Sequence, residues 1–448
     1  MSTNEAGGPA DNADFPPASR AWLSAIIIFA LTAIGLADRM AIAMLIGPIK
    51  QDFGIGDFQA SLLIGLAFTL FYVLFLVPVG VAADRFSRKV VLGAGLLIWS
   101  LATIACGFAG GFFSLFILRM IVGAGEAAIG PCSHGIIGNS FPRHALAKPL
   151  ALQGIGFQVG PAAGVAVAGA ILGAGAAGTF EGIPLLAGLA PWRTAFVLIG
   201  LPGILALPLM LLLDEPNRMR DIAQGRQEQT PLLPFLRANG QLMALVFLGA
   251  ALSAMALGII TGWVPEYLQR SLGVSAMEAG ASLGMVLLVG AIFGQGLYAM
   301  IVDWFAARGL RDAPIKFGLA PLALAIPLSW LVFEMTGAQQ FYIALLALLL
   351  CITPLNALNN TVAQQIAPPE LRSRISALLI LCISIVGFAI APAMVGWLSE
   401  FVLGEAHLGQ AMQLVSCISL ALTMLVYMAT RRPLRTYMAT RYCPSTTG

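Results

Sequence analysis

The sequence predicts an all-α membrane protein in which twelve transmembrane helices form two pseudo-symmetric six-helix bundles. Composition is the first reason: 59% of the 448 residues are hydrophobic and 10% are charged, whereas about a quarter of a soluble domain is charged. The second reason is the number of apolar stretches of about 20 residues, the length that spans a bilayer. The third is the long polar stretch from Asp214 to Gly240, which divides these segments six to six.

The twelve expected segments are rich in Gly and Ala, residues that let helices approach one another closely in lipid. They cover residues 22–49, 58–83, 90–109, 113–140, 146–175, 192–213, 240–270, 276–302, 315–335, 339–366, 374–402 and 408–430.

The distribution of Lys and Arg predicts the orientation. Nineteen of these residues lie in the two tails and the even-numbered connections, and three lie in the odd-numbered connections: Lys50, Arg193 and Arg270. Because positive residues concentrate on the cytoplasmic side, both termini are expected in the cytoplasm of a bacterial cell, with the protein in its inner membrane. The net charge of +3 is explained by topology, so no nucleic-acid partner is expected.

The predicted domain organisation follows from these segments. It comprises a cytoplasmic tail (1–20), a first bundle (21–213), a cytoplasmic loop (214–239), a second bundle (240–431) and a second cytoplasmic tail (432–448). The halves share features: Asp84-Arg85 follows the second segment, and Asp303 stands at the matching place after the eighth. Repeated six-helix halves place a substrate site at their interface, near the middle of the membrane.

Four charged residues interrupt the apolar segments: Asp38 and Arg39 in the first, and Arg119 and Glu126 in the fourth. A charge at the bilayer centre costs roughly 2.5–3.5 kcal/mol on insertion scales, so such residues face a partner or a watery cavity and usually mark a transport pathway. Arg119 and Glu126 are seven residues apart and therefore share one helix face.

Several motifs resemble those of the major facilitator superfamily. Gly80 to Lys89 is similar to the family's G-x-x-x-D-R-x-x-R-K loop signature, and Gly156 to Gly164 resembles its fifth-helix G-x-x-x-G-P-x-x-G motif. Within that family, Asp38-Arg39, Arg119 through Glu126, and Glu215-Pro216 resemble the spinster group. The resemblance implies the major facilitator fold and a transporter of lysolipids or sphingoid phosphates, driven in some members by protons.

In that fold the first and fourth helices are neighbours, so Arg119 can pair with Asp38 or with Glu126. A paired buried carboxylate stays ionised, and one without a partner favours its protonated form. We therefore expect Asp38, Arg119 and Glu126 to couple protonation to conformational change. The alternative is an ion network with a purely structural role.

The resemblance also implies that Asp84, Arg85 and Arg88 form a conformational latch, in which Asp84 lies near the start of the eleventh helix, close to Ser373. The alternative is a simple anchor that fixes the topology.

Other polar and aromatic residues within the segments are expected to line a substrate cavity. Asn356, Asn359 and Asn360 share one helix face, where they either line the cavity or form hydrogen bonds between helices. The remaining cavity candidates are Arg39, Tyr72, Trp263, Glu266, Gln295 and Tyr298.

The residues predict a monomeric, proton-coupled secondary transporter of a small amphipathic, lipid-like substrate, embedded in the bilayer. A multidrug/proton antiporter of the same fold is the nearest alternative, and a receptor without net flux is a distant one. The six cysteines show no C-x-x-C pairing and are interpreted as packing residues, and no nucleotide or zinc motif is present. No metal, cofactor or enzymatic activity is expected.

Overall fold

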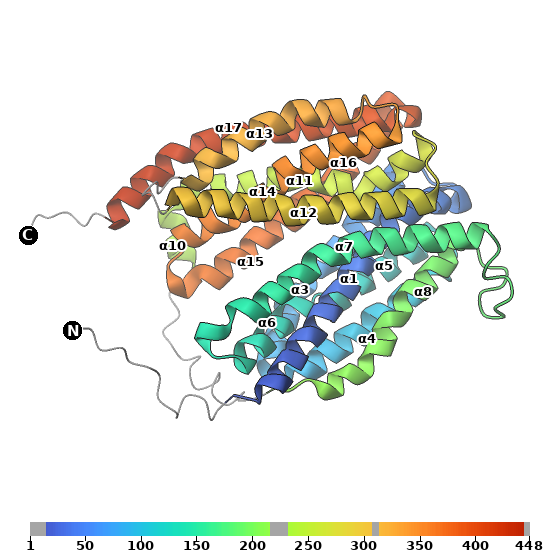
Figure 1. Ribbon diagram of the computed structural model, residues 1–448, viewed down its shortest axis with the longest axis horizontal. Coiled ribbons are helices and arrows are strands. Elements are labelled where there is room, and N and C mark those ends of the chain that lie inside the picture. The colour runs from blue at the N-terminus through green and yellow to red at the C-terminus, as the bar shows by residue number, and fades with distance from the viewer. Residues whose placement is uncertain (1–14, 216–231, 307–312, 443–448) are drawn as a thin grey trace, which may run out of the picture.

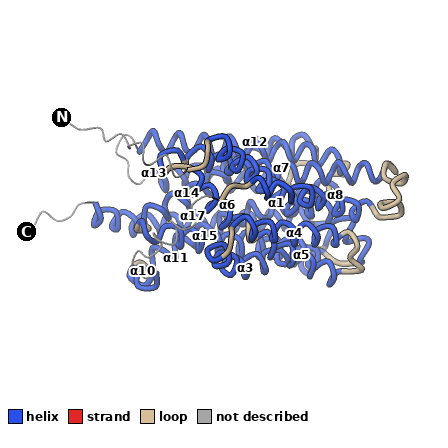
Figure 2. Tube along the Cα trace, turned by 90° about the horizontal axis from the view of Figure 1, so that it is seen from below, coloured by secondary structure: helices blue, strands red, loops and turns tan. Residues whose placement is uncertain are grey.

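The computed structural model describes residues 15–215, 232–306 and 313–442. Throughout these residues the secondary structure consists of helices and their connections, without a strand (Figure 2). In Figure 1 the helices of the first half lie in the lower part of the molecule and those of the second half in the upper part.

The first half contains six helical segments, several of which are subdivided. Its elements are α1 (Ala18–Phe53), α2 (Asp57–Ser61), η1 (Leu62–Leu66), α3 (Ala67–Arg85), α4 (Arg88–Cys106), α5 (Phe112–Glu126), α6 (Ile129–Ser140), η2 (Arg143–Ala145), α7 (Ala147–Ala176), α8 (Pro191–Ala206) and η3 (Leu207–Leu212).

The second half repeats the plan after the short helix α10 (Leu232–Ala238). Its elements are α11 (Gly240–Arg270), α12 (Ala276–Ala306), α13 (Ala313–Val332), α14 (Ala338–Ile366), η4 (Pro369–Leu371), α15 (Arg372–Cys382), η5 (Ile383–Ile390), α16 (Ala391–Leu398), η6 (Ser399–Leu403), η7 (Glu405–His407) and α17 (Leu408–Tyr442).

Among the described residues, eleven helices are long and apolar enough to span a membrane. The expected ninth segment, 315–335, corresponds to α13, in which Gly318–Val332 forms a shorter apolar helix. The all-helical, two-bundle fold is confirmed. The exact domain boundaries stay a prediction, and α10 lies inside the stretch that was expected to be a loop.

The expected fourth segment, 113–140, corresponds to one candidate membrane span, Phe112–Ser140. The helix is interrupted between Glu126, the last residue of α5, and Ile129, the first of α6. Just before the interruption, α5 is pressed against α4: a Cβ on Gly125 would lie 2.8 Å from the Gly95 carbonyl oxygen. Glu126 is the last residue of α5, and its side chain lies against Gly35 of α1.

Small residues also join the two halves. α7 of the first half packs along α12 of the second. A Cβ on Gly169 would come within 2.4 Å of the Ala276 carbonyl oxygen, so only glycine allows this approach. Such contacts are how helices associate in lipid, where the hydrophobic effect does not drive them together.

Candidate functional site

The four charged residues predicted from the sequence meet in the interior of the first half. Asp38 and Arg39 lie within α1, and Arg119 and Glu126 lie on α5. Arg119 is completely buried, and Asp38 and Glu126 are 2% and 4% exposed. Charges buried to this extent need partners, so their contacts decide what the site can do.

Arg119 pairs with Asp38 rather than with Glu126. Its Nη1 lies 3.5 Å from Oδ1 of Asp38, and its Nη2 donates to the Arg39 carbonyl oxygen at 3.4 Å. The second Asp38 oxygen, Oδ2, accepts a hydrogen bond from the hydroxyl of Thr103 on α4. One carboxylate thus links three helices, α1, α4 and α5.

Glu126 has a different environment. Its side chain packs against the backbone of Gly35, one turn before Asp38 on α1. In the described part of the chain its Oε2 is buried without a hydrogen-bond partner. The charges that act on it belong to Arg39, Asp38 and Arg119. Of the two carboxylates, only Glu126 has an oxygen free to hold a proton without breaking an existing bond.

Arg39 is held by aromatic rings. Its guanidinium lies 4.4 Å from the ring centre of Phe68, 5.6 Å from that of Tyr72 and 5.2 Å from that of Phe388. Phe388 belongs to η5 in the second half, so this cation–π contact joins the halves. Among the described residues, Nη2 of Arg39 is buried without an acceptor.

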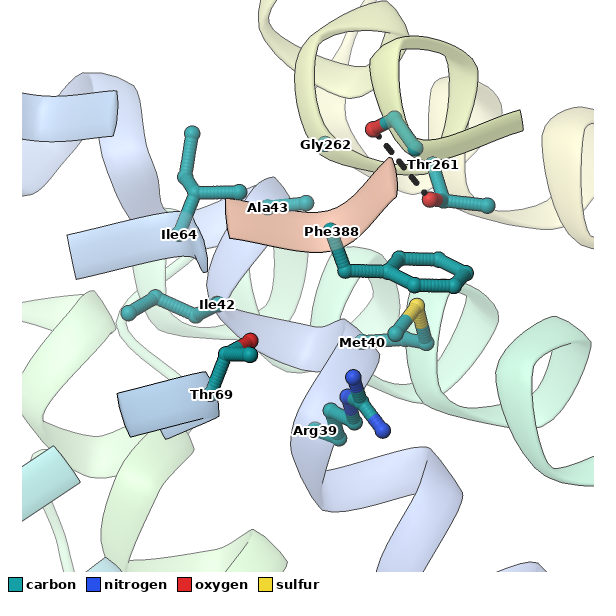
Figure 3. Close-up of a pocket in the computed structure, with 10 residues that line it drawn as sticks. Arg39, Met40, Ile42, Ala43, Ile64, Thr69, Thr261, Gly262 and Phe388 are labelled. Carbon is teal, nitrogen blue, oxygen red and sulfur yellow. Dashed lines mark hydrogen bonds between the residues drawn. The ribbon is translucent and has the colours of Figure 1, made fainter. Parts of the chain in front are cut away.

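A small pocket lies beside Arg39 at the interface of the halves (Figure 3). Residues of both halves line it: Arg39, Met40, Ile42, Ala43, Ile64 and Thr69 from the first, and Gly258, Thr261, Gly262 and Phe388 from the second. A site built from both halves is what a mechanism of rocking halves requires.

A second cluster of charges lies where α1 ends and α2 begins, and we call this end of the molecule the Asp57 end. The Asp57 carboxylate is completely buried and accepts hydrogen bonds from Arg270 of the second half at 2.8 and 3.0 Å. Ser399 of the second half donates at 2.6 Å, and Lys50 of the first half also donates to it. Asp57 therefore binds the two halves together.

Further contacts across the halves surround Asp57. Lys50 pairs with Glu405 at 3.1 Å, and the Phe58 amide donates to Glu400 at 2.7 Å. Glu266, 3.7 Å from Arg270, lies so close to α1 that a Cβ on Gly47 would stand 2.5 Å from its Oε2. These contacts close the Asp57 end.

The three exceptions to the Lys/Arg pattern are all in ion pairs at this end. Lys50 and Arg270 bind Asp57, and Arg193 pairs with Asp52 at 2.9 Å within the first half. Sequence reasoning noted these three cations but did not assign them a role. These three cations lie on the side of the membrane where Lys and Arg are rare, and this was the sequence signal that could have identified the network.

The predicted latch residues lie at the opposite end of the molecule. Asp84 and Arg85, the last residues of α3, are exposed. The Arg88 amide donates to Oε1 of Glu215 at 2.7 Å, and its Nη1 donates to the Gly135 carbonyl oxygen at 3.3 Å. The side chain of Ser373, the expected neighbour of Asp84, lies outside the described residues, so the latch stays a prediction.

The other cavity candidates do not gather at the pocket. Trp263 is completely buried and donates to the Pro392 carbonyl oxygen at 3.0 Å. Asn359 donates to Ser253 at 2.9 Å and accepts from Tyr427 at 2.7 Å, which favours the expected alternative of hydrogen bonds between helices. Glu266 belongs to the Asp57 end.

The remaining members of the cavity prediction vary in exposure. Asn356 is half-buried and Asn360 is exposed, Gln295 on α12 is half-buried, and Tyr298 is buried. Tyr72 contacts Arg39 and stacks on Phe68, with ring centres 5.5 Å apart. Within the described residues, no group of three potential ligands that could hold a metal ion occurs.

Sequence reasoning missed Thr103, Thr69 and Phe388. A threonine in an apolar helix carries no signal of its own, because its hydroxyl usually bonds to its own helix. Phe388 is one of 25 phenylalanines. Only tertiary contacts distinguish these residues from their equivalents elsewhere in the chain.

Comparison with known proteins decides the family. The model of the Major Facilitator Superfamily matches residues 27–392. The chain belongs to the Major Facilitator Superfamily. It is therefore a multi-pass membrane protein and a secondary transporter rather than an enzyme.

The similar proteins carry names that describe different transport functions. An MFS-type efflux pump of Mycolicibacterium smegmatis is 26% identical over 420 residues, which cover 93% of this chain and 94% of that protein. Protein spinster of Drosophila melanogaster is 23% identical over 398 residues, covering 86% of this chain and 63% of that protein. A D-galactonate transporter of Escherichia coli is 26% identical over 341 residues, covering 68% and 73%.

The fold is similar to that of solved transporters. A bacterial homologue of the human lysosomal transporter Spinster, in an inward-facing and unoccupied conformation, gives a TM-score of 0.80 at 24% identity, with 96% of this chain and 100% of that chain covered. A D-xylose–proton symporter gives 0.68 at 16% identity, covering 90% and 97%. The resemblance to spinster proteins expected from the sequence is confirmed at the level of fold.

Proposed function

We propose that this protein is a proton-coupled transporter that moves a single-chain, lipid-like amphipath by alternating access. The observation that carries the proposal is the division of labour between two buried carboxylates. Asp38 is neutralised by Arg119 and bonded to Thr103. Among the described residues, Oε2 of Glu126 has no partner, and Glu126 is the group we assign as the proton carrier.

Proton transfer to Glu126 would change the forces on its neighbours. An ionised Glu126 attracts Arg39 and Arg119 on both sides of the α1–α5 contact, and a protonated one does not. Arg39 also contacts Phe388 of the second half. Protonation of Glu126 would therefore alter the force on a side chain that lies at the interface between the halves. One proton moving through 100 mV supplies about 2.3 kcal/mol, enough for roughly a 50-fold gradient of a neutral solute.

The orientation completes the proposal. With both termini in the cytoplasm, the Asp57 end faces the periplasm, and its network holds the protein with the pathway closed on that side. Asp84, Arg85 and Arg88 then lie on the cytoplasmic side, where we propose that they form the latch of the opposite, outward-open state.

Two features support a lipid-like substrate. The pocket is lined mostly by apolar side chains, with one guanidinium. Spinster proteins are among the relatives in both sequence and fold. An aliphatic chain would pack against the apolar lining and leave a polar headgroup beside Arg39.

Drug efflux is the second candidate. The MFS-type efflux pump of M. smegmatis matches over nearly the whole of both chains, and its name describes a protein that exports its substrate. The same proton carrier would serve such an antiporter. Competition separates the two: lysolipid uptake that is blocked by cationic drugs at low concentration favours the antiporter.

The decisive experiment measures uptake of a labelled lysophospholipid into proteoliposomes, with and without a pH gradient. We expect gradient-driven uptake by the wild type and its loss, by at least about 100-fold, in Glu126→Gln, which cannot ionise. Glu181→Gln, at an exposed position in the connection after α7, is the matched control and should behave as the wild type.

Retained gradient-driven uptake in Glu126→Gln would contradict the assignment of the proton carrier. Absence of lysolipid uptake by the wild type, together with gradient-driven drug export, would move the substrate to the second candidate.

A further inference from the structure

Carboxylates outnumber cations in the network that joins the halves at the Asp57 end. Among the described residues, its carboxylates are those of Asp57, Glu266, Glu400 and Glu405, and its cations are Lys50 and Arg270. An ion taken out of water without a matching charge is costly. The excess negative charge must therefore be compensated by hydrogen bonds or by a proton.

Three of the four carboxylates accept hydrogen bonds. Asp57 accepts them from three side chains. Glu405 accepts from Lys50 and from the Asp57 amide, each at 3.1 Å. Glu400 accepts from the Phe58 amide at 2.7 Å. The two amides stand at the start of α2, where backbone N–H groups lack helical partners and favour an anion, so the surroundings of these three carboxylates suit the ionised form.

Glu266 is the exception. It is 4% exposed, and in the described part of the chain its carboxylate accepts no hydrogen bond. Its one ion pair is long: Oε1 lies 3.7 Å from Nη1 of Arg270, and both Nη atoms of that guanidinium donate to Asp57 at 2.8 and 3.0 Å. The charges that act on Glu266 are those of Arg270, Lys50, Asp57 and Glu405. Two are positive and two are negative, so Glu266 itself carries the excess charge.

The position of Glu266 links this excess to the closure of the Asp57 end. Glu266 belongs to α11 of the second half, and a Cβ on Gly47 of α1 would stand 2.5 Å from its Oε2. The backbone of α1 thus occupies one side of the carboxylate and excludes water there. The side chain keeps 6% of its surface exposed, which gives solvent protons access. Closing this end therefore removes hydration from a carboxylate that gains no hydrogen bond in exchange.

We propose that Glu266 is a second proton-binding site, which takes up a proton from solvent as the Asp57 end closes and releases it as this end opens. Protonation converts the carboxylate into a neutral carboxylic acid and removes the excess negative charge from the network. The inference rests on the closure of the Asp57 end, and it depends on neither the proposed substrate nor Glu126. With the orientation proposed above, the proton comes from the periplasm.

The sign of the pH dependence follows from this assignment. The closed conformation binds one proton more than the open one, so acid favours closure and alkali favours opening. One linked proton changes the ratio of the two conformations by at most about tenfold per pH unit. The alternative is a purely structural ion pair between Glu266 and Arg270, and in that case removing the charge of Glu266 would open this end.

Distances between spin labels at Gln51 and Ala406, exposed positions in the two halves, test the site. They are measured on the purified full-length protein in detergent, in a cysteine-free background. The pH is varied from about 5 to about 9, a range wide enough for a buried carboxylate to change its protonation. The test variant is Glu266→Gln, which keeps the shape of the side chain and fixes it in an uncharged form.

Two variants are matched controls. Glu278→Gln removes a carboxylate that is exposed in the first turn of α12, outside the network. His407→Gln removes the exposed histidine of η7, which is the other group at this end that titrates near neutral pH. Both should show the same pH dependence as the wild type.

We expect the separated population of the wild type to be at least tenfold larger at the alkaline limit than at the acid limit. Glu266→Gln should stay closed at every pH, with a separated population no larger than that of the wild type in acid. Asp57→Asn should do the opposite and open this end, because Asp57 accepts the bonds that cross between the halves. Two carboxylates of one network thus differ in the direction of their effect.

Three results would overturn the site. The first is a wild type whose label distances do not change with pH. The second is opening of the Asp57 end by Glu266→Gln, which would establish the structural ion pair. The third is a pH dependence that persists in Glu266→Gln and disappears in Glu126→Gln, which would place the linked proton at Glu126.

The label distances also separate this inference from the proposed function. Gradient-driven uptake that persists in Glu126→Gln, together with distances that depend on Glu266, would contradict the proposed proton carrier alone. Uptake that requires Glu126, together with a pH dependence of the distances that survives Glu266→Gln, would contradict the second proton site alone.

Discussion

The Asp57 end and the centre of the molecule both bury charged residues between helices, but they differ in how far the buried polar atoms have partners. At the Asp57 end, the buried carboxylate accepts bonds from Arg270, Lys50 and Ser399, and those from Arg270 and Ser399 cross between the halves. At the centre, Glu126, Arg39 and Thr69 each keep a buried atom without a partner in the described residues.

The difference indicates two kinds of function. A network of paired charges across the halves stabilises one conformation, because separating the halves would break several charge-assisted bonds at once. A cluster with unused donors and acceptors is ready to bind, since a proton or a ligand gains bonds there without displacing any. We infer that the Asp57 end stabilises one conformation of the protein, whereas the central cluster can bind a proton or a ligand.

The largest effect is expected from breaking the one complete ion pair at the centre. Arg119→Gln leaves Asp38 buried with only Thr103 as a partner, and removing one member of a buried pair costs about 3–5 kcal/mol. Thermal unfolding of the purified variant should show this loss of stability, and proteoliposome uptake should fall by at least about 100-fold.

The double variant Arg119→Gln/Asp38→Asn should regain most of the stability but not the gradient-driven uptake. Arg193→Gln, which alters the Arg193–Asp52 pair at the edge of the first half, should cost much less. If Arg119→Gln were as stable as the wild type, the centre would not depend on this pair.

A smaller but specific effect is expected at the Asp57 end. Asp57→Asn keeps the size of the side chain and removes its charge, so the bonds from Lys50 and Arg270 lose about 1.5–3 kcal/mol each at most. Spin labels at the exposed positions Gln51 and Ala406, in a cysteine-free background, should show a separated population increased tenfold or more.

Asp52→Asn is the matched control, because Asp52 lies at the same end but bonds to Trp192 and Arg193 of its own half. It removes the same charge without touching a contact between the halves. An equal shift of the spin-label distances in both variants would show that net charge, and not the bridging bonds, holds this end closed.

The smallest of these effects is expected at Thr103. Thr103→Val removes one hydrogen bond from Asp38 and leaves its ion pair with Arg119, so the maximal rate of uptake should fall about tenfold with KM unchanged. Thr32→Val, which removes a hydroxyl bonded only to its own helix on α1, should leave the rate unchanged. A changed KM would instead place Thr103 in the substrate pathway.

The sequence by itself determined the helical membrane fold, the two halves and the residues of the central charge cluster. Long apolar stretches force helices, because in lipid each backbone polar group must be satisfied within its own segment. Charges within such stretches are costly enough that their presence indicates function. These are local properties, and Asp38, Arg119 and Glu126 could therefore be found without any structure.

Only the tertiary structure decided which charge pairs with which. Arg119 had two carboxylates within reach by sequence, and in the structure its partner is Asp38. Trp263 was expected in the cavity, and Asn359 either there or in hydrogen bonds between helices; both are bonded within the second half. Thr69 of α3 and Phe388 of η5, more than 300 residues apart in the chain, became notable only because they line one pocket. Pairing depends on a few ångströms of helix position, which packing between distant segments sets and local sequence does not.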